Sequence, residues 1–484
     1  MRLAMKKIFQ YSGLIATFIL IVLSISCNKL SNDNNDIYTY TPPPPKPISD
    51  STPLSGSISG TMLAGKTYQV TADIYVNAGD SLVIQPGVKV VFLNQSGLIV
   101  KGNLYSLGTK ENPIWLTGNV VTKTDAPTIG FSAAKDSAFS GVWKGVFGDV
   151  TCEYMILKWT HVQYCGAPAG VNGSSAYLVA GLSATDNSYA LYFSNGKGNF
   201  VFEDSWIYGT VDDAIRIAGS GGKFAILRST FERCGKNGGD ILNIKAGGVG
   251  DMAYNFFIGG ATNSLKAANS GIAPGIPNCE ARVYNNTIVN SGYRQTKTGR
   301  GGSINYENGA RGQVFNNLMI NCKYGLRLNS NVPDTAYMYN NNYGYNYYWA
   351  DSLSVANQIF PYVTGAVTKP VATDLPNPFS YLPANYKYVP DVAYDGSKIV
   401  QTGNPLFVNY PVPVTGGYRL QDITAIGNFK FSLQPNSPCI GKGFTGFTPM
   451  KEIPVDVKYG VTEYTPPGSD IGCYQFNGRG NQHY

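Results

Sequence analysis

Two aspartates recur at matching positions in neighbouring segments, and they are the acids best placed for chemistry. Asp212–Ile217 aligns with Gly239–Ile244 at an offset of 27 residues, so Asp213 matches Asp240. Carboxylates about 5 Å apart repel each other unless a cation or a basic side chain lies between them. Asp213 and Asp240 are therefore candidate ligands of a cation, and Arg216, three residues after Asp213, is a candidate basic partner.

Histidine is nearly absent, which removes several kinds of catalytic site. The chain has two histidines, His161 at the start of a predicted core strand and His483 in a Gly/Asn-rich tail. Ser-His-Asp and Cys-His catalysis and His-rich metal sites are therefore excluded. Basic residues outside 1–26 number 34 against 30 acidic ones, without a marked cluster, so nucleic acid is not an expected partner.

A repeat of irregular length positions these residues. Val283–Ser291 reads against Val314–Cys322 at an offset of 31 residues. Extending that register aligns a polar column, which consists of Thr160, Asp204, Ser229, Asn255, Asn286, Asn317 and Asn341. A short strand also recurs, with two buried residues on either side of an exposed one. The exposed positions are Tyr192, Arg216, Asn243, Asn305 and Arg327, and Leu265–Ala267 is a looser match.

Three short strands per repeat, without helices between them, predict an all-β fold: a right-handed parallel β-helix, or single-stranded solenoid. Successive coils stack at about 4.8 Å, so the polar column forms a ladder of side chains at a tight turn. A β-sandwich, the alternative, predicts hairpin turns and no aligned columns. On the β-helix, Tyr192, Asn243, Asn305 and Arg327 share a column with Arg216 and are candidate substrate-binding residues.

The N-terminus has the pattern of an export signal. Basic residues precede the apolar stretch Ile8–Ile25, and Ser26 comes directly before Cys27. This pattern resembles a bacterial lipobox and predicts a lipoprotein signal peptide over residues 1–26, with Cys27 lipidated. Residues 27–57 are predicted to be a Pro-rich linker that holds the protein away from a membrane. The alternatives are an ordinary signal peptide with an incidental Cys, or a short membrane anchor.

The two ends of the predicted solenoid resemble a known group. Thr67–Thr117 is similar to the N-terminal coils of bacterial right-handed parallel β-helix surface lipoproteins, in the pectate-lyase-like β-helix superfamily. Gly403–Val408, Phe431–Gly441 and Ser469–Tyr474 resemble that group's closing coil. The resemblance implies N-terminal coils over 58–150, central coils with loop insertions over 151–400, a closing coil over 401–476 and a disordered tail over 477–484.

The resemblance leaves the activity open, because the group includes polysaccharide lyases, glycosidases and proteins with no known chemistry. Lyases of this architecture use a Lys or Arg base beside a uronate, with acids that hold calcium. That implies Arg216 as the base, with Asp213 and Asp240 as catalytic or calcium-binding acids. The paired aspartates also resemble those of β-helix polygalacturonases, but the second acidic element and the histidine of that group have no counterpart here.

A plainer interpretation of the same residues stays open. An Asp before a strand is commonly a turn former that bonds its own backbone. Arg216 and Arg327 could be exposed residues in the middle of strands. The Tyr-rich stretch Tyr337–Trp349 could stack on sugars or could seal the core.

Seven cysteines follow Cys27, and an odd number argues against a complete disulfide framework. Three of them, Cys165, Cys234 and Cys322, fall in a column of small residues and are predicted to be buried thiols. Cys439 and Cys473 stand where the related group has small residues, in two segments of the closing coil. The resemblance thus implies a Cys439–Cys473 disulfide.

The sequence predicts a cell-surface lipoprotein that engages a polysaccharide or other glycan, with catalysis left open. One alternative is a calcium-assisted polysaccharide lyase, and the other is a non-catalytic adhesin or a scaffold that binds an envelope protein. Calcium is the only cofactor that these residues suggest. The expected location is the surface of the outer membrane of a Gram-negative bacterium, where the lipid anchor would hold a monomer.

Overall fold

A computed structural model of the chain describes residues 46–119, 137–218, 220–295, 297, 300–329, 341–350, 362–363, 404–410 and 429–483. The predicted signal peptide, Cys27, most of the linker 27–57 and nearly all of 351–403 lie outside these residues. Within the described ranges, no helix is long and apolar enough to cross a membrane.

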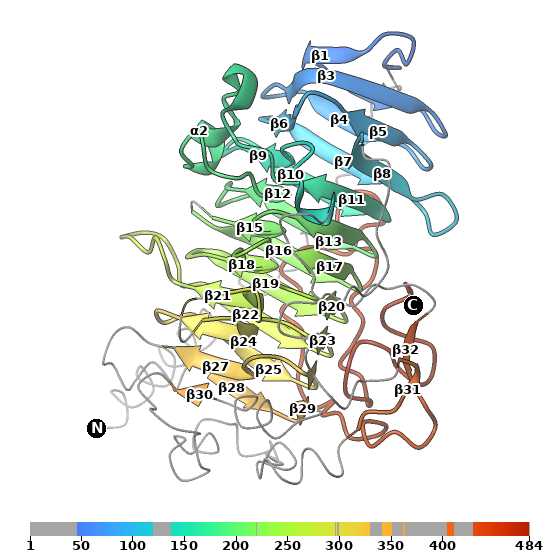
Figure 1. The fold of residues 1–484 in the computed structure, drawn as a ribbon, viewed down its shortest axis with the longest axis vertical. Coiled ribbons are helices and arrows are strands. Elements are labelled where there is room, and N and C mark those ends of the chain that lie inside the picture. Colours follow the sequence, from blue (N-terminus) through green and yellow to red (C-terminus); the bar gives the residue numbers. More distant parts are fainter. Residues whose placement is uncertain are drawn as a thin grey trace, which may run out of the picture. The chain divides into compact units, whose positions relative to one another are not determined.

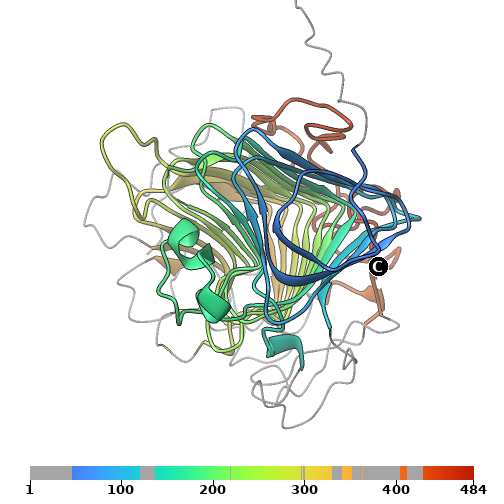
Figure 2. The same cartoon turned by 90° about the horizontal axis from the view of Figure 1, so that it is seen from above.

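Each turn of the chain contributes one strand to each of three parallel ladders (Figures 1 and 2). The first ladder contains β2 (Gly60–Met62), β4 (Ser81–Ile84), β7 (Asn103–Leu107), β10 (Tyr154–Lys158), β13 (Asn199–Glu203), β16 (Gly222–Leu227), β19 (Gly248–Ala253), β22 (Glu280–Tyr284), β25 (Arg311–Phe315) and β28 (Asn341–Gly344). The second contains β3 (Thr67–Val76), β5 (Lys89–Phe92), β8 (Ile114–Gly118), β11 (Thr160–Cys165), β14 (Trp206–Thr210), β17 (Thr230–Cys234), β20 (Phe256–Ile258), β23 (Thr287–Val289), β26 (Leu318–Ile320) and β29 (Tyr347–Trp349).

The third ladder begins with β1 (Leu54–Ser57) and the C-terminal part of β3. The long strand β3 therefore belongs to two ladders, because its N-terminal part pairs in the second and its C-terminal part in the third. It continues through β6 (Leu98–Val100), β9 (Val146–Gly148), β12 (Leu191–Phe193), β15 (Ile215–Ile217), β18 (Leu242–Ile244), β21 (Asn263–Ala268), β24 (Gly302–Glu307), β27 (Leu326–Asn329) and β30 (Tyr362–Val363). Outside the ladders lie η1 (Ser137–Phe139), η2 (Val171–Gly173), α2 (Ala176–Ala180) and the antiparallel pair β31 (Phe407–Asn409) and β32 (Lys430–Leu433). The predicted right-handed parallel β-helix is confirmed.

Apolar side chains from the three ladders fill the interior of the stack. In the third ladder, one inward column consists of Leu191, Ile215, Leu242, Leu265, Ile304 and Leu326, all buried. These pairings confirm the predicted recurring strand, including the looser match at Leu265–Ala267. In the described part of the Tyr-rich stretch, Tyr343, Tyr347 and Tyr348 are buried, so they belong to the core rather than to a sugar-stacking surface.

A ladder of buried polar side chains fixes each coil over the next, at the bend between the first and second ladders. The Asn255 N–H donates to Asn286 Oδ1 at 2.9 Å, and the Asn286 N–H donates to Asn317 Oδ1 at 3.1 Å. The members are Ser106, Thr160, Ser205, Ser229, Asn255, Asn286, Asn317 and Asn346. At this bend the backbone of one coil bonds to a side chain of the next coil. The bend therefore specifies the register of the whole stack.

Two predicted members of this polar column are corrected. Leu157 pairs with Phe202, which places Ser205 in the ladder in place of Asp204. Phe315 pairs with Gly344, which places Asn346 in the ladder in place of Asn341. The predicted position is one residue away at Asp204 and five residues away at Asn341, and the strand pairing selects the observed one.

From Thr160 to Asn346, the residue before each ladder position has a left-handed backbone, which residues other than Gly and Asn seldom adopt. Its φ is 48° at Arg228, 58° at Tyr254 and 50° at Asn285. These side chains contact residues 429–483, which we call the C-terminal segment (Figure 1). The Tyr254 hydroxyl donates to the Pro466 carbonyl, and Asn285 Oδ1 accepts the Gly468 N–H at 3.1 Å. The C-terminal segment therefore lies along the outside of this bend.

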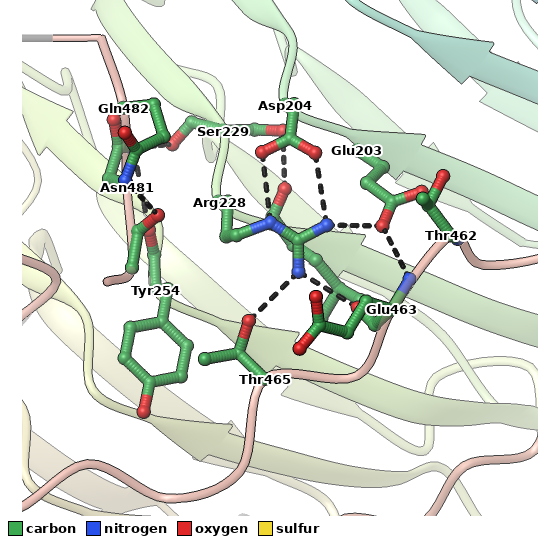
Figure 3. Close-up of polar contacts among 12 residues, drawn as sticks. Glu203, Asp204, Arg228, Ser229, Tyr254, Thr462, Glu463, Thr465, Asn481 and Gln482 are labelled. Atoms are coloured by element: carbon green, nitrogen blue, oxygen red, sulfur yellow. Dashed lines mark hydrogen bonds and ion pairs between the residues drawn. The ribbon is translucent and has the colours of Figure 1, made fainter. Parts of the chain in front are cut away.

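Arg228 joins buried acids of the coils to the C-terminal segment (Figure 3). Its guanidinium donates to both oxygens of Asp204, at 2.9 and 3.0 Å, and to the Glu463 carbonyl at 2.8 Å. It also pairs with Glu203, which is fully buried and accepts the Thr462 N–H at 2.9 Å. Arg228 thus neutralises two acids of the coils, and the same group of side chains forms hydrogen bonds with the backbone of the C-terminal segment.

The structure corrects two expectations for the end of the chain. Residues 429–476 do not add a closing coil, because they lie alongside coils that are already formed. Residues 477–483 are not a disordered tail: the buried Asn481 side chain donates to the Ser229 carbonyl at 3.1 Å, and His483 packs against Trp159.

The Cys439–Cys473 disulfide is also corrected, since both thiols are free and buried. The Cys439 N–H donates to Ser437 Oγ at 3.3 Å and the Cys473 N–H donates to Thr287 Oγ1 at 2.9 Å, so the two cysteines are held by different parts of the chain. Burial raises the pKa of the Cys439 thiol to about 12, which keeps it protonated. Cys165, Cys234 and Cys322 are buried thiols, as predicted.

Replacing Arg228 by Met should destabilise the protein by about 3–5 kcal/mol, because Asp204 would remain buried without its cation and Glu203 would keep only Lys158, at 3.6 Å. Urea unfolding measures the change. The matched control is Arg479→Met, which removes an exposed arginine of the same segment and should stay within about 0.5 kcal/mol of wild type. Equal unfolding midpoints for the two variants would contradict the assigned role of Arg228.

Candidate functional site

The predicted site residues stack on the outside of the third ladder. Strand pairing aligns them in one column, which we call the outer column: Tyr192, Arg216, Asn243, Lys266, Asn305 and Arg327. The column contains Arg216 and all four predicted substrate-binding residues, together with Lys266. Because the strands are parallel and in register, consecutive members lie about 4.8 Å apart along the stack.

Asp213 lies just before β15 and organises the neighbouring side chains. Its Oδ1 accepts the Asp240 N–H at 2.6 Å, so the two acids are on adjacent coils, as the 27-residue offset predicts. Its Oδ2 accepts Arg216 at 3.0 Å and the Asn243 amide at 2.7 Å. Both oxygens of Asp213 therefore already have donors.

Asp240 has a similar set of partners one coil further on. Its Oδ1 accepts the Asn263 side chain at 2.8 Å, and its Oδ2 lies 3.7 Å from the Lys266 ammonium. Lys266 also pairs with Glu307 at 3.0 Å. The result is an alternating network of acids and bases across adjacent coils.

This arrangement does not fit calcium at Asp213 and Asp240. Calcium takes six to eight oxygen ligands, whereas the four carboxylate oxygens here face N–H groups and cations. Across the described ranges, no three or more His, Cys, Asp or Glu side chains form a group that could hold a metal. The positive charge that the two carboxylates require comes from Arg216 and Lys266.

Burial and repulsion from Asp213 shift Asp212 and Asp240 toward the neutral form. Burial, followed by the neighbouring Asp213 charge, raises the pKa of Asp212 to about 7. Burial likewise raises the pKa of Asp240, although Lys266 opposes the shift. At Arg216 burial acts to lower the pKa, but Asp213 and Tyr189 outweigh it and the pKa rises. An arginine held protonated in this way does not suit the predicted role of base and suits that of anion ligand.

Lys245, the first residue after β18, has no ion-pair partner among the described residues. Burial lowers the pKa of its ammonium to about 8, and repulsion from Arg216 and Lys266 adds to that effect. We call Arg216, Lys245 and Lys266 the cationic patch. The network neutralises Arg216 and Lys266 and leaves Lys245 as a cation without a counter-ion.

Exposure separates the outer column into accessible and inaccessible members. The Arg216 side chain is 27% exposed and that of Lys266 is 15% exposed. Tyr192, Asn305 and Arg327 are 4%, 0% and 1% exposed, so these predicted substrate-binding residues cannot contact a ligand as they lie. Asn243 is also buried, and its amide positions Asp213.

The buried members have structural roles. Tyr192 packs with Phe147 and with the insertion that carries α2, in a separate apolar cluster. Arg327 donates to Asn263 at 3.2 Å, and its guanidinium lies 5.1 Å from the centre of the Tyr324 ring. The outer column is therefore apolar and covered at its N-terminal end and charged from Arg216 onward.

Sequence reasoning did not select Lys266, Lys245 and Glu307 as site residues. Lys266 lies at the exposed position of the looser match Leu265–Ala267, so the register carried one coil further would have found it. Glu307 follows Asn305 by two residues on β24 and shares its face. The importance of Lys245 comes from burial and from charges on neighbouring coils, and no local pattern contains that information.

No protein-family model matches the chain, and no curated protein matches it. Among solved structures, the crystal structure of the Dettilon tailspike protein is similar at 12% sequence identity and a TM-score of 0.18. The match covers 62% of this chain and 62% of the tailspike chain, so this chain spans less than two thirds of that protein. A likeness this weak says nothing about the function of this chain.

Proposed function

We propose that this chain binds an anionic polysaccharide through the cationic patch of its β-helix. The observation that carries the proposal is Lys245, a half-buried ammonium with no counter-ion in the described part of the chain, between two further cations. A uronate carboxylate would supply the missing charge. Charge-assisted hydrogen bonds of this kind are stronger than neutral ones.

The surroundings suit a polymer rather than a single anion. Arg216, Lys245 and Lys266 come from consecutive coils, so the patch extends along the stack in steps of about 4.8 Å. Asp213, Asp240 and Glu307 lie behind the cations and hold them in place. A chain of linked uronates could thus place several carboxylates against one rigid surface, and rigidity lowers the entropic cost of binding.

Replacing Lys245 by Gln should weaken binding to polygalacturonate about tenfold, because one charge-assisted contact is lost. Affinity electrophoresis in gels containing polygalacturonate or alginate measures the change. Lys197→Gln is the matched control, because Lys197 is exposed in the β12–β13 turn and does not belong to the patch. Equal mobility of both variants, or no retardation of wild type by either polymer, would overturn the proposal and favour an adhesin that binds protein.

One observation also favours a polysaccharide lyase. A lysine with a pKa of about 8 can be a general base at mildly alkaline pH, which Arg216 cannot be. In such a reaction the neutral Lys245 amine takes the proton next to the uronate carboxylate, and Arg216 stabilises the charge on that carboxylate. A carbon–carbon double bond forms as the bond to the neighbouring glycosidic oxygen breaks, and that oxygen leaves with a proton from water.

The pH dependence separates binding from elimination. Lys245 loses its proton as the pH rises through about 8, so binding should weaken between pH 7 and pH 9, whereas elimination should accelerate. Retardation in the gels and ultraviolet absorbance of unsaturated product measure the two. Lys245→Arg keeps the charge at pH 9, so it should retain binding there and abolish elimination. A flat binding profile for wild type would show that Lys245 does not contact the polymer.

We further propose that the protein is exported and lipidated at Cys27, on the lipobox-like pattern that ends at Ser26. Cys27→Ser should then move the protein from the outer-membrane fraction into the soluble fraction. Incorporation of a labelled fatty acid into wild type, but not into the variant, is the confirming measurement. A variant that stays with the membrane would show that another segment anchors the chain.

A further inference from the structure

A pocket of about 650 Å³ lies at the N-terminal end of the outer face, four strands before Arg216 of the cationic patch. Its walls come from β3, from the turn after β5 and from the insertion loop around η2. Tyr75 belongs to its lining and continues the outer column in the N-terminal direction, through Ile99 and Phe147 to Tyr192. The volume lies within the range of ~300–1,000 Å³ that is typical of small-ligand sites.

A buried ion pair lies in this pocket. The Lys144 ammonium, 1% exposed, donates to Asp73 Oδ1 at 3.0 Å and to the Gln95 carbonyl at 2.6 Å. The Gly97 N–H donates to the same Asp73 oxygen at 2.8 Å. Burial lowers the pKa of Lys144, although Asp73 opposes the shift. Such a pair costs desolvation energy, and a hydrophobic pair would stabilise the fold at least as well.

One of the two carboxylate oxygens of Asp73 remains available to a ligand. Its Oδ1 takes both donors, whereas its Oδ2 accepts no hydrogen bond from any described residue. Asp73 is only 9% exposed, and it lines the pocket, so the free oxygen is a hydrogen-bond acceptor in a recess. The ion pair leaves the recess without net charge.

Amide side chains form the rim. The Asn172 amide donates to the Asn94 carbonyl at 2.7 Å, which fastens the insertion loop to the turn after β5. Asn94, Gln95 and Asn172 all have left-handed backbones, with φ of 52°, 53° and 58°.

We propose that this pocket binds an uncharged, hydroxyl-rich sugar unit. A carboxylate oxygen and several amides are the groups that bind sugar hydroxyls, and the Tyr75 ring offers a face on which a sugar ring can stack. The ion pair is neutral as a whole, but the free Asp73 oxygen repels a uronate carboxylate at close range, and a single carboxylate is too few ligands for a divalent cation. This site is therefore distinct in ligand class from the cationic patch and does not depend on it.

The test uses a soluble form, residues 28–484, with cellotriose, maltotriose and mannotriose as probes. Saturation-transfer NMR detects binding and calorimetry gives its strength. At least one neutral trisaccharide should bind, and Thr71→Trp, which fills the pocket from β3, should weaken it at least tenfold. Tyr75→Leu, which keeps the apolar packing and removes the ring, should weaken it as well.

Controls separate this site from the proposed polyanion site. The pocket variants should keep the wild-type melting temperature and polygalacturonate binding, and Lys245→Gln should keep trisaccharide binding. If Thr71→Trp fails to fold, Tyr75→Leu and the double variant Asp73→Asn/Lys144→Met, which leaves no unpaired buried charge, take its place. Wild type that binds none of the three probes, or trisaccharide binding that survives every pocket variant, would overturn the inference.

Discussion

The hydrogen bonds from each coil's backbone to a buried polar side chain of the next coil determine the rest of the structure. At Asn255, Asn286 and Asn317 both the N–H and the side-chain amide bond to the following residue of the ladder. A slip of one residue would break these bonds and turn the buried columns outward. The outer column therefore lies where this register places it, with Arg216 beside Asn243 and Lys266.

The same bend also holds the C-terminal segment. A tight turn puts the preceding residue in a left-handed conformation, and its side chain points away from the core toward residues 429–483. Arg228 and Asn285 thus use strained positions to bind a segment more than 150 residues away in sequence. One geometric requirement specifies both the stacking of the coils and the outer layer that covers one of their edges.

Much of the fold could be predicted from the sequence, because in-register stacking turns a spatial column into a periodic pattern. The third-ladder strands and the adjacent positions of Asp213 and Asp240 follow from offsets alone. Asp204 and Ser205 could not be told apart in this way, since both are polar and only strand pairing selects one. The path of residues 429–483, and with it the free Cys439 and Cys473, depends on contacts with no periodicity.

The charged residues of the site could likewise be predicted only in part. Which acids and bases share a face could be predicted, whereas which of them keep a partner could not, because partners are set by side-chain reach and burial. Asp213 neutralises Arg216, whereas Lys245 has no counter-ion among the described residues.

The most direct test of the proposed polyanion site is the pKa of Lys245, measured by NMR of isotope-labelled lysine with and without oligogalacturonate. The account predicts a value of about 8 that rises when the oligomer binds. An ordinary value near 10.5, unchanged by oligogalacturonate, would contradict it.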